Sequence, residues 1–228
     1  MHSADEKNII LCIAPHPDDE TLGCGGSLLR HVAEGEQVHW LIMTSMIPSE
    51  GFSVERIDGR EREIDEVSRA YGFKATHRAG LPTTRLDTLP KSDLVSAVSQ
   101  VVQAIHPRTV YVPYRNDAHS DHAAVFDAAI ACCKSFRYPS IKQVMAYETL
   151  SETEFGLRTD DPGFRPNLFN DTSAWIDRKI DIMKMYTGEL GVFPFPRSEA
   201  CLRAQAQLRG SQAGVLSAEA FMILKEIR

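Results

Sequence analysis

The stretch APHPDDETLGCGG occupies residues 14–26 and directly follows the apolar run NIILCI at residues 8–13. The run predicts a buried strand, and the stretch places a histidine, three acids and two prolines where that strand ends. Charged groups beside a hydrophobic core are costly unless they are paired or hold a metal ion. The stretch therefore indicates either a well-solvated loop or a functional site, and the rest of the chain has to decide between them.

Strand and helix signals alternate along most of the chain. Short apolar runs predict strands at 8–14, 38–44, 109–113 and 144–147. Apolar residues at helical spacing predict helices at 26–33, 54–71, 92–105 and 121–136. After a turn-rich segment at 151–172, helices are expected at 174–186, 197–208 and 217–227. Strands separated by helices predict an α/β fold, a Rossmann-like three-layer sandwich with a mostly parallel sheet.

The composition is that of an ordinary globular chain. Its 228 residues fit one domain over 1–228, and no internal repeat or linker divides them. The formal charge of −6 argues against nucleic acid or an anionic membrane as the main partner. No apolar run approaches the roughly 20 residues that span a bilayer, and no signal peptide is evident at the start. The five cysteines include no Cys-x-x-Cys pair, which favours reduced thiols and a cytoplasmic protein.

Two strand ends, at residues 15–20 and 117–122, are rich in side chains that can hold a metal. Ligands of open α/β sheets bind at the carboxyl ends of strands, so we expect these two segments to meet. His16 and Asp19 could bracket a tight turn, and a helix after the second segment would bring His122 into the same crevice. Two nitrogens and one carboxylate oxygen, with a fourth position open, are the donor set of a catalytic zinc site.

Simpler interpretations exist for each part of this pattern. A lone His-Pro or His-x-x-His is usually a surface or capping feature, and Asp121 alone is more often the N-cap of a helix than a catalytic residue. Gly23, Gly25 and Gly26 do not match the Gly-x-Gly-x-x-Gly fingerprint of a dinucleotide site, so we expect them to allow close helix packing. Two His/Asp clusters at two strand ends are much harder to obtain by chance, and together they favour a metal site.

The motif PHPDDE with a later His-x-Asp-His resembles the LmbE-like, or PIG-L, family of zinc-dependent N-acetylglucosaminide deacetylases. The resemblance covers most of the chain. Arg60 and Glu63 are similar to an Arg-x-x-Glu helix of that family, and Lys179, Tyr186 and the segment 218–221 are similar to its C-terminal part.

The resemblance implies roles for the residues of both clusters. It implies three zinc ligands, His16, Asp19 and His122, although iron, cobalt or nickel could occupy the same donors. It implies Asp18 as the general base, His119 as the group that stabilises the oxyanion or protonates the leaving amine, and Asp121 as the residue that orients His119. Arg60 is expected to contact a sugar or phosphate at the pocket rim. The alternative is that Arg60 only supports its helix by pairing with Glu63.

Some segments depart from the family pattern. The loop 45–51 lacks the Thr-x-Gly turn of many members, and residues 186–189 stand where many have Ser-Gln. Both segments are expected to shape the substrate pocket. The apolar segment 193–196, Phe-Pro-Phe-Pro, is expected to be exposed as a lid or as a contact in a homo-oligomer.

The leading hypothesis is metal-dependent hydrolysis of the N-acetyl amide of an N-acetylglucosamine-type sugar or sugar conjugate, which releases acetate and a free amine. A first alternative is an N-acyl amidase of the same family that acts on a non-sugar or antibiotic-type substrate. A second alternative is a non-catalytic sugar-binding module with a structural zinc ion. The second is disfavoured because structural zinc sites use four protein ligands, whereas this pattern offers three and a spare acid, Asp18.

Overall fold

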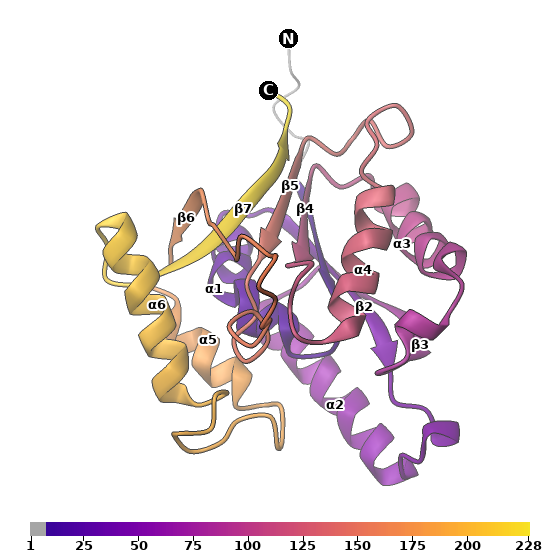
Figure 1. The fold of residues 1–228 in the computed structure, drawn as a ribbon, viewed down its shortest axis with the longest axis horizontal. Helices are drawn as coiled ribbons and strands as arrows, with labels where there is room; N and C mark the ends of the chain where they lie inside the picture. The colour runs from indigo at the N-terminus through magenta and orange to yellow at the C-terminus, as the bar shows by residue number, and fades with distance from the viewer. Residues whose placement is uncertain (1–7) are drawn as a thin grey trace.

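The computed structural model describes residues 8–228, which form a seven-stranded sheet with helices on both faces (Figure 1). The strands are β1 (Ile9–Ala14), β2 (Gln37–Ser45), β3 (Ala75–Pro82), β4 (Thr109–Pro113), β5 (Gln143–Tyr147), β6 (Leu168–Asp171) and β7 (Ala218–Glu226). The helices are α1 (Asp19–Ala33), α2 (Val54–Tyr71), α3 (Lys91–Ile105), α4 (Ser120–Ala131), α5 (Ile176–Met183) and α6 (Glu199–Ala213). Short 3-10 turns lie at Pro48–Glu50 and Leu86–Thr88.

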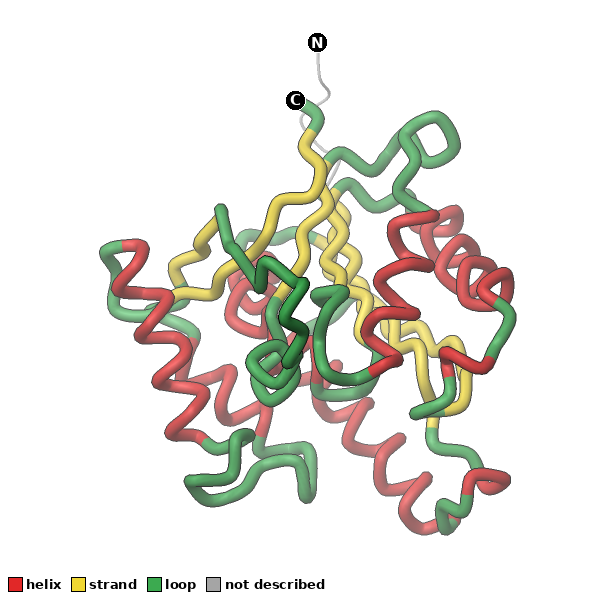
Figure 2. The backbone as a smooth tube through the Cα atoms, in the orientation of Figure 1, coloured by secondary structure: helices red, strands yellow, loops and turns green. Residues whose placement is uncertain are grey.

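The sheet has the order β3-β2-β1-β4-β5-β7-β6. Neighbours among β1 to β5 are parallel, whereas β7 runs antiparallel to both β5 and β6. β1 is apolar on both faces because it is covered on both: Ile10 and Cys12 pack with α1, α2 and α5, and Leu11 and Ile13 pack with α3 and α4. The tube in Figure 2 shows these helices on either side of the strands. The predicted α/β fold with a mostly parallel sheet is confirmed.

The C-terminal part of the chain differs from the prediction. The helix expected at 217–227 is wrong, because Ala218–Glu226 form β7 between β5 and β6. This segment is rich in Ala, Glu, Leu, Met and Lys, which favour helices. That preference is weak, and the hydrogen bonds that the segment makes with β5 on one side and β6 on the other outweigh it. The pattern also missed β3 and β6. β3 is only half-buried along its length and contains Gly80, so it has no continuous apolar run.

α1 begins at Asp19 rather than at residue 26, and its backbone leaves helical geometry at Cys24. The early start is possible because glycines let this helix lie close to its neighbours. A Cβ atom on Gly23 would collide with the ring of Tyr147 on β5. The close packing expected of the glycines is therefore confirmed. The early start also places Asp19 in the first turn of α1, directly after β1.

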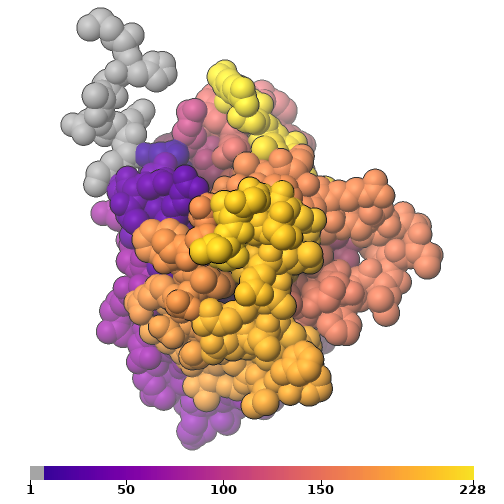
Figure 3. All heavy atoms as spheres, turned by 90° about the vertical axis from the view of Figure 1, so that its left-hand side faces the viewer, coloured from indigo at the N-terminus to yellow at the C-terminus, as the bar shows by residue number. Residues whose placement is uncertain are grey.

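The order of the strands positions the site. β1 and β4 are adjacent, and the chain continues from β1 into α1 on one face and from β4 into α4 on the other. A crevice forms at such a point, outside the carboxyl ends of the strands. α6, at the left of Figure 1, covers the side of the molecule that faces the viewer in Figure 3. Among residues 8–228, no helix has both the length and the apolar character needed to cross a bilayer.

Candidate active site

Three predicted metal ligands lie together in the crevice between β1 and β4. His16 follows β1, Asp19 opens α1, and His122 lies in the first turn of α4. The Asp19 Oδ2 atom is 3.2 Å from His16 Nδ1 and 3.3 Å from His122 Nε2. One donor atom from each of the three residues lies within 4.8 Å of the other two. The turn that joins His16 to Asp19 is closed because the backbone N–H of His16 donates to Asp19 Oδ2 at 2.8 Å.

The donor atoms of this triad suit a divalent metal ion. His122 Nε2 is buried and has no hydrogen-bond partner among residues 8–228. The other ring nitrogen, Nδ1, lies 2.7 Å from Asp117 Oδ2, so a neutral ring with its proton on Nδ1 would offer the Nε2 lone pair to a metal ion. Burial alone would raise the pKa of Asp19, but His122 and His16 hold it well below its usual range. An imidazole lone pair beside a carboxylate is a donor set that zinc prefers.

Asp117 was not given a role by the sequence analysis, although it belongs to the second cluster. Its carboxylate connects His122 to the segment after β5, because Thr153 Oγ1 donates to Asp117 Oδ1 at 2.6 Å. Burial raises the pKa of Asp117 to about 6, against the influence of His122. A carboxylate in this position fixes the orientation of a ligating imidazole. The spacing of Asp117 from His122 within one cluster was the only signal for this role.

The neighbouring acids Asp18 and Asp19 point in different directions. Asp18 has a φ of 129°, which is rare for a residue with a side chain, and its side chain lines the cavity, which Asp19 does not. Arg197 Nη1 donates to Asp18 Oδ2 at 2.9 Å. Burial raises the pKa of Asp18 well above its usual range, and the adjacent Asp19 adds to this, while Arg197 opposes it. Asp18 therefore faces the cavity beside the triad and not the triad itself.

His119 and Asp121 are placed differently from the expected pair. The Asp121 carboxylate accepts from His16 Nε2 at 3.0 Å and from the backbone N–H groups of Thr84 and Leu86. It lies 4.0 Å from His119 Nδ1, and the backbone N–H of Asp121 donates to that nitrogen at 3.1 Å. The carboxylate thus orients His16, and the backbone of α4 orients His119. Because Nδ1 accepts a hydrogen bond, neutral His119 carries its proton on Nε2.

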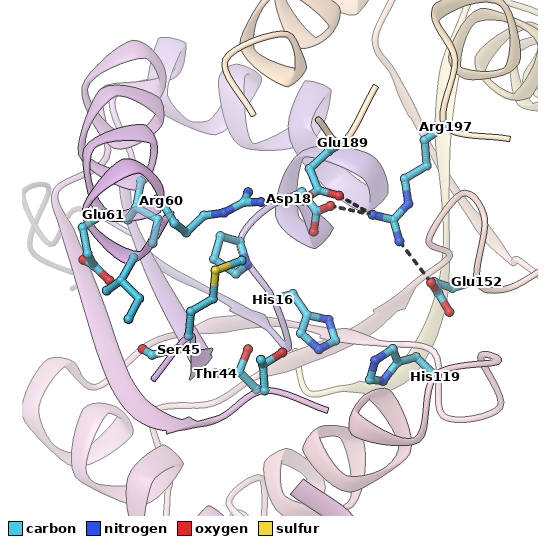
Figure 4. Close-up of a pocket in the computed structure, with 15 residues that line it drawn as sticks. His16, Asp18, Thr44, Ser45, Arg60, Glu61, His119, Glu152, Glu189 and Arg197 are labelled. Atoms are coloured by element: carbon cyan, nitrogen blue, oxygen red, sulfur yellow. Dashed lines mark hydrogen bonds and ion pairs between the residues drawn. The ribbon is translucent and has the colours of Figure 1, made fainter. Parts of the chain in front are cut away.

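A cavity of about 170 Å³ adjoins the triad. Figure 4 shows its polar side chains, which converge from the segment after β1, from β2 and α2, and from the segments after β5 and before α4 and α6. Its apolar side consists of Pro17, Met46, Ile57 and Ile64. Ser45 at the end of β2, Met46 from the loop after it, and Glu189 from the segment after α5 line the same cavity. The expectation that these two segments shape the pocket is confirmed.

Arg60 lines this cavity from α2 and is almost fully buried. Its Nη2 atom donates to Glu189 Oε1, and its Nε atom lies 3.4 Å from Glu63 Oε2. Its Nη1 atom is buried without a hydrogen-bond partner among residues 8–228. The pairing with Glu63 is therefore present, but it does not account for the whole guanidinium group.

Two other residues of the cavity carried no sequence signal: Glu152 and Arg197. They belong to irregular segments outside the two clusters. Arg197 is paired with Asp18, which is 179 positions away in the chain. The apolar segment between Glu189 and Arg197 is exposed as expected, with 65% of Phe193 and 46% of Phe195 accessible.

Known proteins are similar to this chain in sequence and in fold. A curated relative, an uncharacterized deacetylase YaiS from Escherichia coli, is 30% identical over 156 residues, which cover 66% of this chain and 79% of the relative. A 1D-myo-inositol 2-acetamido-2-deoxy-alpha-D-glucopyranoside deacetylase from Kribbella flavida is 25% identical, with 80% of this chain and 83% of that protein covered. The crystal structure of a conserved protein from Thermus thermophilus superposes with a TM-score of 0.76 and 27% identity, over 96% of each chain.

The family comparison covers both clusters of candidate metal ligands. The model for PIG-L, described as GlcNAc-PI de-N-acetylase, matches residues 11–133, which is more than half of the 228 residues. The matched region begins in β1 and ends just after α4, so it contains His16, Asp19 and His122. The chain therefore belongs to the PIG-L family of deacetylases.

Proposed function

We propose that this protein is a metal-dependent deacetylase that hydrolyses the N-acetyl amide of an N-acetylglucosamine-type sugar or sugar conjugate, releasing acetate and a free amine. One observation carries the proposal: a His-Asp-His donor set adjoins a cavity into which a separate, buried carboxylate points. A structural metal site has no use for that carboxylate. A hydrolytic site does, because an attacking water must give up a proton.

His16, Asp19 and His122 are the residues that would hold the metal, and zinc fits their donor atoms. When bound, the ion would polarise the amide carbonyl and lower the pKa of water, which are the two functions an amide hydrolase needs from it. Asp121 supports His16, and Asp117 supports His122, so both imidazoles are held by a second carboxylate. This support favours a fixed ligand geometry.

Asp18 is proposed as the general base. One of its oxygens accepts from Arg197, and its carboxylate lines the cavity next to His16. The other oxygen is available to take a proton from the attacking water. The backbone at Asp18 supports this role, because a strained φ is retained where function requires a side chain to point in an unusual direction.

His119 is proposed as the donor on the opposite side of the scissile amide. It lines the cavity, and its Nδ1 atom accepts from the backbone of Asp121. The Nε2–H group can then donate to the oxygen that gains charge, or to the nitrogen that leaves as the amine. The leaving nitrogen receives the proton that Asp18 took from water, so the proton taken up and the proton delivered balance.

Arg60 is proposed to bind a polar oxygen of the substrate through its unpartnered Nη1 atom. A hydrogen bond from a charged group is worth about 1.5–3 kcal/mol, so we expect Arg60→Ala to raise KM by roughly 10- to 100-fold. Arg62→Ala, at an exposed position of the same helix, is the matched control and should leave KM unchanged. An unaltered KM and kcat in Arg60→Ala would mean that this side chain only supports α2.

The apolar side of the cavity favours a second candidate function. Met46, Ile57 and Ile64 could receive an apolar acyl or aglycone group, as an N-acyl amidase with a non-sugar substrate would need. The relatives support the sugar, because one of them is named for a 2-acetamido-2-deoxy-glucopyranoside. The two candidates share the metal site and differ in what fills the rest of the cavity.

The test is a panel of N-acetylated sugars, sugar conjugates and non-sugar N-acyl amines, offered to protein whose bound metal has been quantified. The proposal predicts equal amounts of acetate and amine from one or more of the sugars, and no release after chelation. Release only from the non-sugar amides would favour the amidase. No release from any compound by metal-loaded protein would contradict both and favour a binding module.

A further inference from the structure

Arg197 connects several parts of the cavity. Its Nη1 atom donates to Asp18 Oδ2 at 2.9 Å and to Glu189 Oε2 at 3.0 Å, and its Nη2 atom donates to Glu152 Oε1 at 3.2 Å (Figure 4). Its Nε atom donates to Ser151 Oγ at 2.7 Å. The guanidinium is thus held along both edges of its plane, by residues from three separate segments. A planar group with several fixed donors is suited to orient a carboxylate.

The backbone beside Arg197 is fixed as well. Its carbonyl accepts from the N–H of Gly191 at 2.9 Å, which closes the loop that contains the exposed apolar segment 193–196. The next residue, Ser198, caps α6 by accepting from the N–H of Cys201 at 3.2 Å. The start of a helix and a closed loop therefore set the point from which the Arg197 side chain reaches into the cavity.

Asp18 depends on this contact. Arg197 is the only side chain among residues 8–228 that hydrogen-bonds the Asp18 carboxylate. The backbone of Asp18 is anchored separately, because its N–H donates to Glu20 Oε2 at 3.1 Å and its carbonyl accepts the first bonds of α1. The backbone contacts thus fix the position of the Asp18 main chain, and Arg197 fixes the position of its carboxylate.

Glu189 extends the connection to the substrate-binding side. One of its oxygens accepts from Arg197 and the other from Arg60. The proposed base and the proposed substrate-binding arginine are therefore linked through two side chains, Arg197 and Glu189. Both come from the segment between α5 and α6, far from the motifs that mark the metal site.

We propose that Arg197 is a positioning residue for hydrolysis: it holds one oxygen of Asp18 so that the other faces the attacking water. The inference rests on the function proposed above. In the step concerned, an O–H bond of water breaks, its oxygen bonds to the amide carbon, and the proton passes to the free oxygen of Asp18. Without Arg197, the carboxylate can rotate about its side-chain bonds, and a misplacement of about 1 Å can cost roughly 100-fold in rate.

The kinetic test compares Arg197→Ala, Arg197→Lys and the wild-type protein. Arg197→Ala should lower kcat by about 10- to 100-fold, with KM nearly unchanged and with the same bound metal per chain. Added guanidinium should restore part of the lost kcat, because it can occupy the space between Asp18 and Glu189. Arg197→Lys keeps the positive charge but loses the several fixed N–H donors of the guanidinium, so its kcat should lie between those of Arg197→Ala and the wild type. Arg203→Ala, on the outer side of α6, is the matched control and should have the wild-type kcat.

A second measurement does not depend on activity. Crystal structures of the wild type and of Arg197→Lys are compared, since the lysine variant keeps the fold even if the alanine variant does not. The wild type should show one conformer of Asp18, and Arg197→Lys should show a displaced Asp18 carboxylate. The inference is overturned if Asp18 has the same position in both, if kcat in Arg197→Ala stays within threefold, or if guanidinium rescues nothing. An inactive, metal-loaded wild type would refute the proposed function, and the Asp18 positions would still decide the inference.

Discussion

Replacing Asp117 by Asn tests how the carboxylate that contacts His122 supports the proposed metal site. The Asp117 and His122 side chains are both buried, and 2.7 Å separates Asp117 Oδ2 from His122 Nδ1. Asn can still accept a hydrogen bond from His122, but it carries no charge. The ligating nitrogen of His122 should then be a weaker donor, while the position of the ring is kept.

The magnitude follows from the kind of contact that is changed. Loss of a carboxylate behind a metal-bound imidazole lowers metal affinity by about 10- to 100-fold, which corresponds to about 1.4–2.8 kcal/mol. Asp117→Asn keeps the hydrogen bond, so we expect the lower end, about 10-fold. Asp117→Ala removes the bond to His122 and also the bond from Thr153, so we expect about 100-fold.

The assay is competition for zinc between the protein and a chromogenic chelator, which reports affinity without any need for turnover. Asp127→Asn is the matched control, since Asp127 lies on the outer side of α4 and pairs with Arg115. It should bind zinc like the wild type. Zinc affinities within twofold of the wild type in both Asp117 variants would refute the idea that this carboxylate tunes His122.

Two further predictions concern stability. Burial lowers the pKa of His39 to about 4, and the stacked His77 adds to this. Below pH 6.5 the unfolded chain therefore binds more protons at His39 than the folded chain does, which should destabilise the fold by up to about 2 kcal/mol at pH 5. We expect the free energy of unfolding, measured with urea, to fall less for His39→Gln than for the wild type between pH 7 and 5. An equal fall in both proteins would contradict this. Gly23→Ala should lower the free energy of unfolding by about 1–3 kcal/mol, because the new Cβ atom collides with Tyr147. Gly59→Ala, where the Cβ atom meets open space, should raise it by about 0.5–1 kcal/mol. Equal shifts of the melting temperature in the two variants would contradict the close packing at Gly23.

The parts of the fold that sequence predicted well have local causes. α2 has the predicted bounds, because Ser53 caps its start and Gly72 ends it in a left-handed conformation with a φ of 78°. β1 and β4 are buried on both faces and therefore appear as continuous apolar runs. β7 could not be predicted in this way, because its residues favour a helix and only pairing with β5 and β6 makes the segment a strand.

The same distinction applies to the site. His16 and Asp19 are joined by one turn, and His122 follows an adjacent strand, so two short motifs were enough to predict that all three would meet. The hydrogen bond of Asp121 with His16, which it makes while lying 4.0 Å from His119, depends on how two loops meet in space. Arg197 has no motif at all, because its partners come from segments that only the folded chain brings together.

The adjacent acids Asp18 and Asp19 are expected to have separate tasks, and a comparison of their alanine variants can separate these. Bound zinc per chain and kcat are measured side by side for Asp18→Ala, Asp19→Ala and the wild type. We expect Asp19→Ala to lose zinc and activity together, whereas Asp18→Ala should keep its zinc and lose about 10²- to 10⁴-fold in kcat. Zinc lost from Asp18→Ala but kept by Asp19→Ala, or near-normal kcat in both variants, would contradict it.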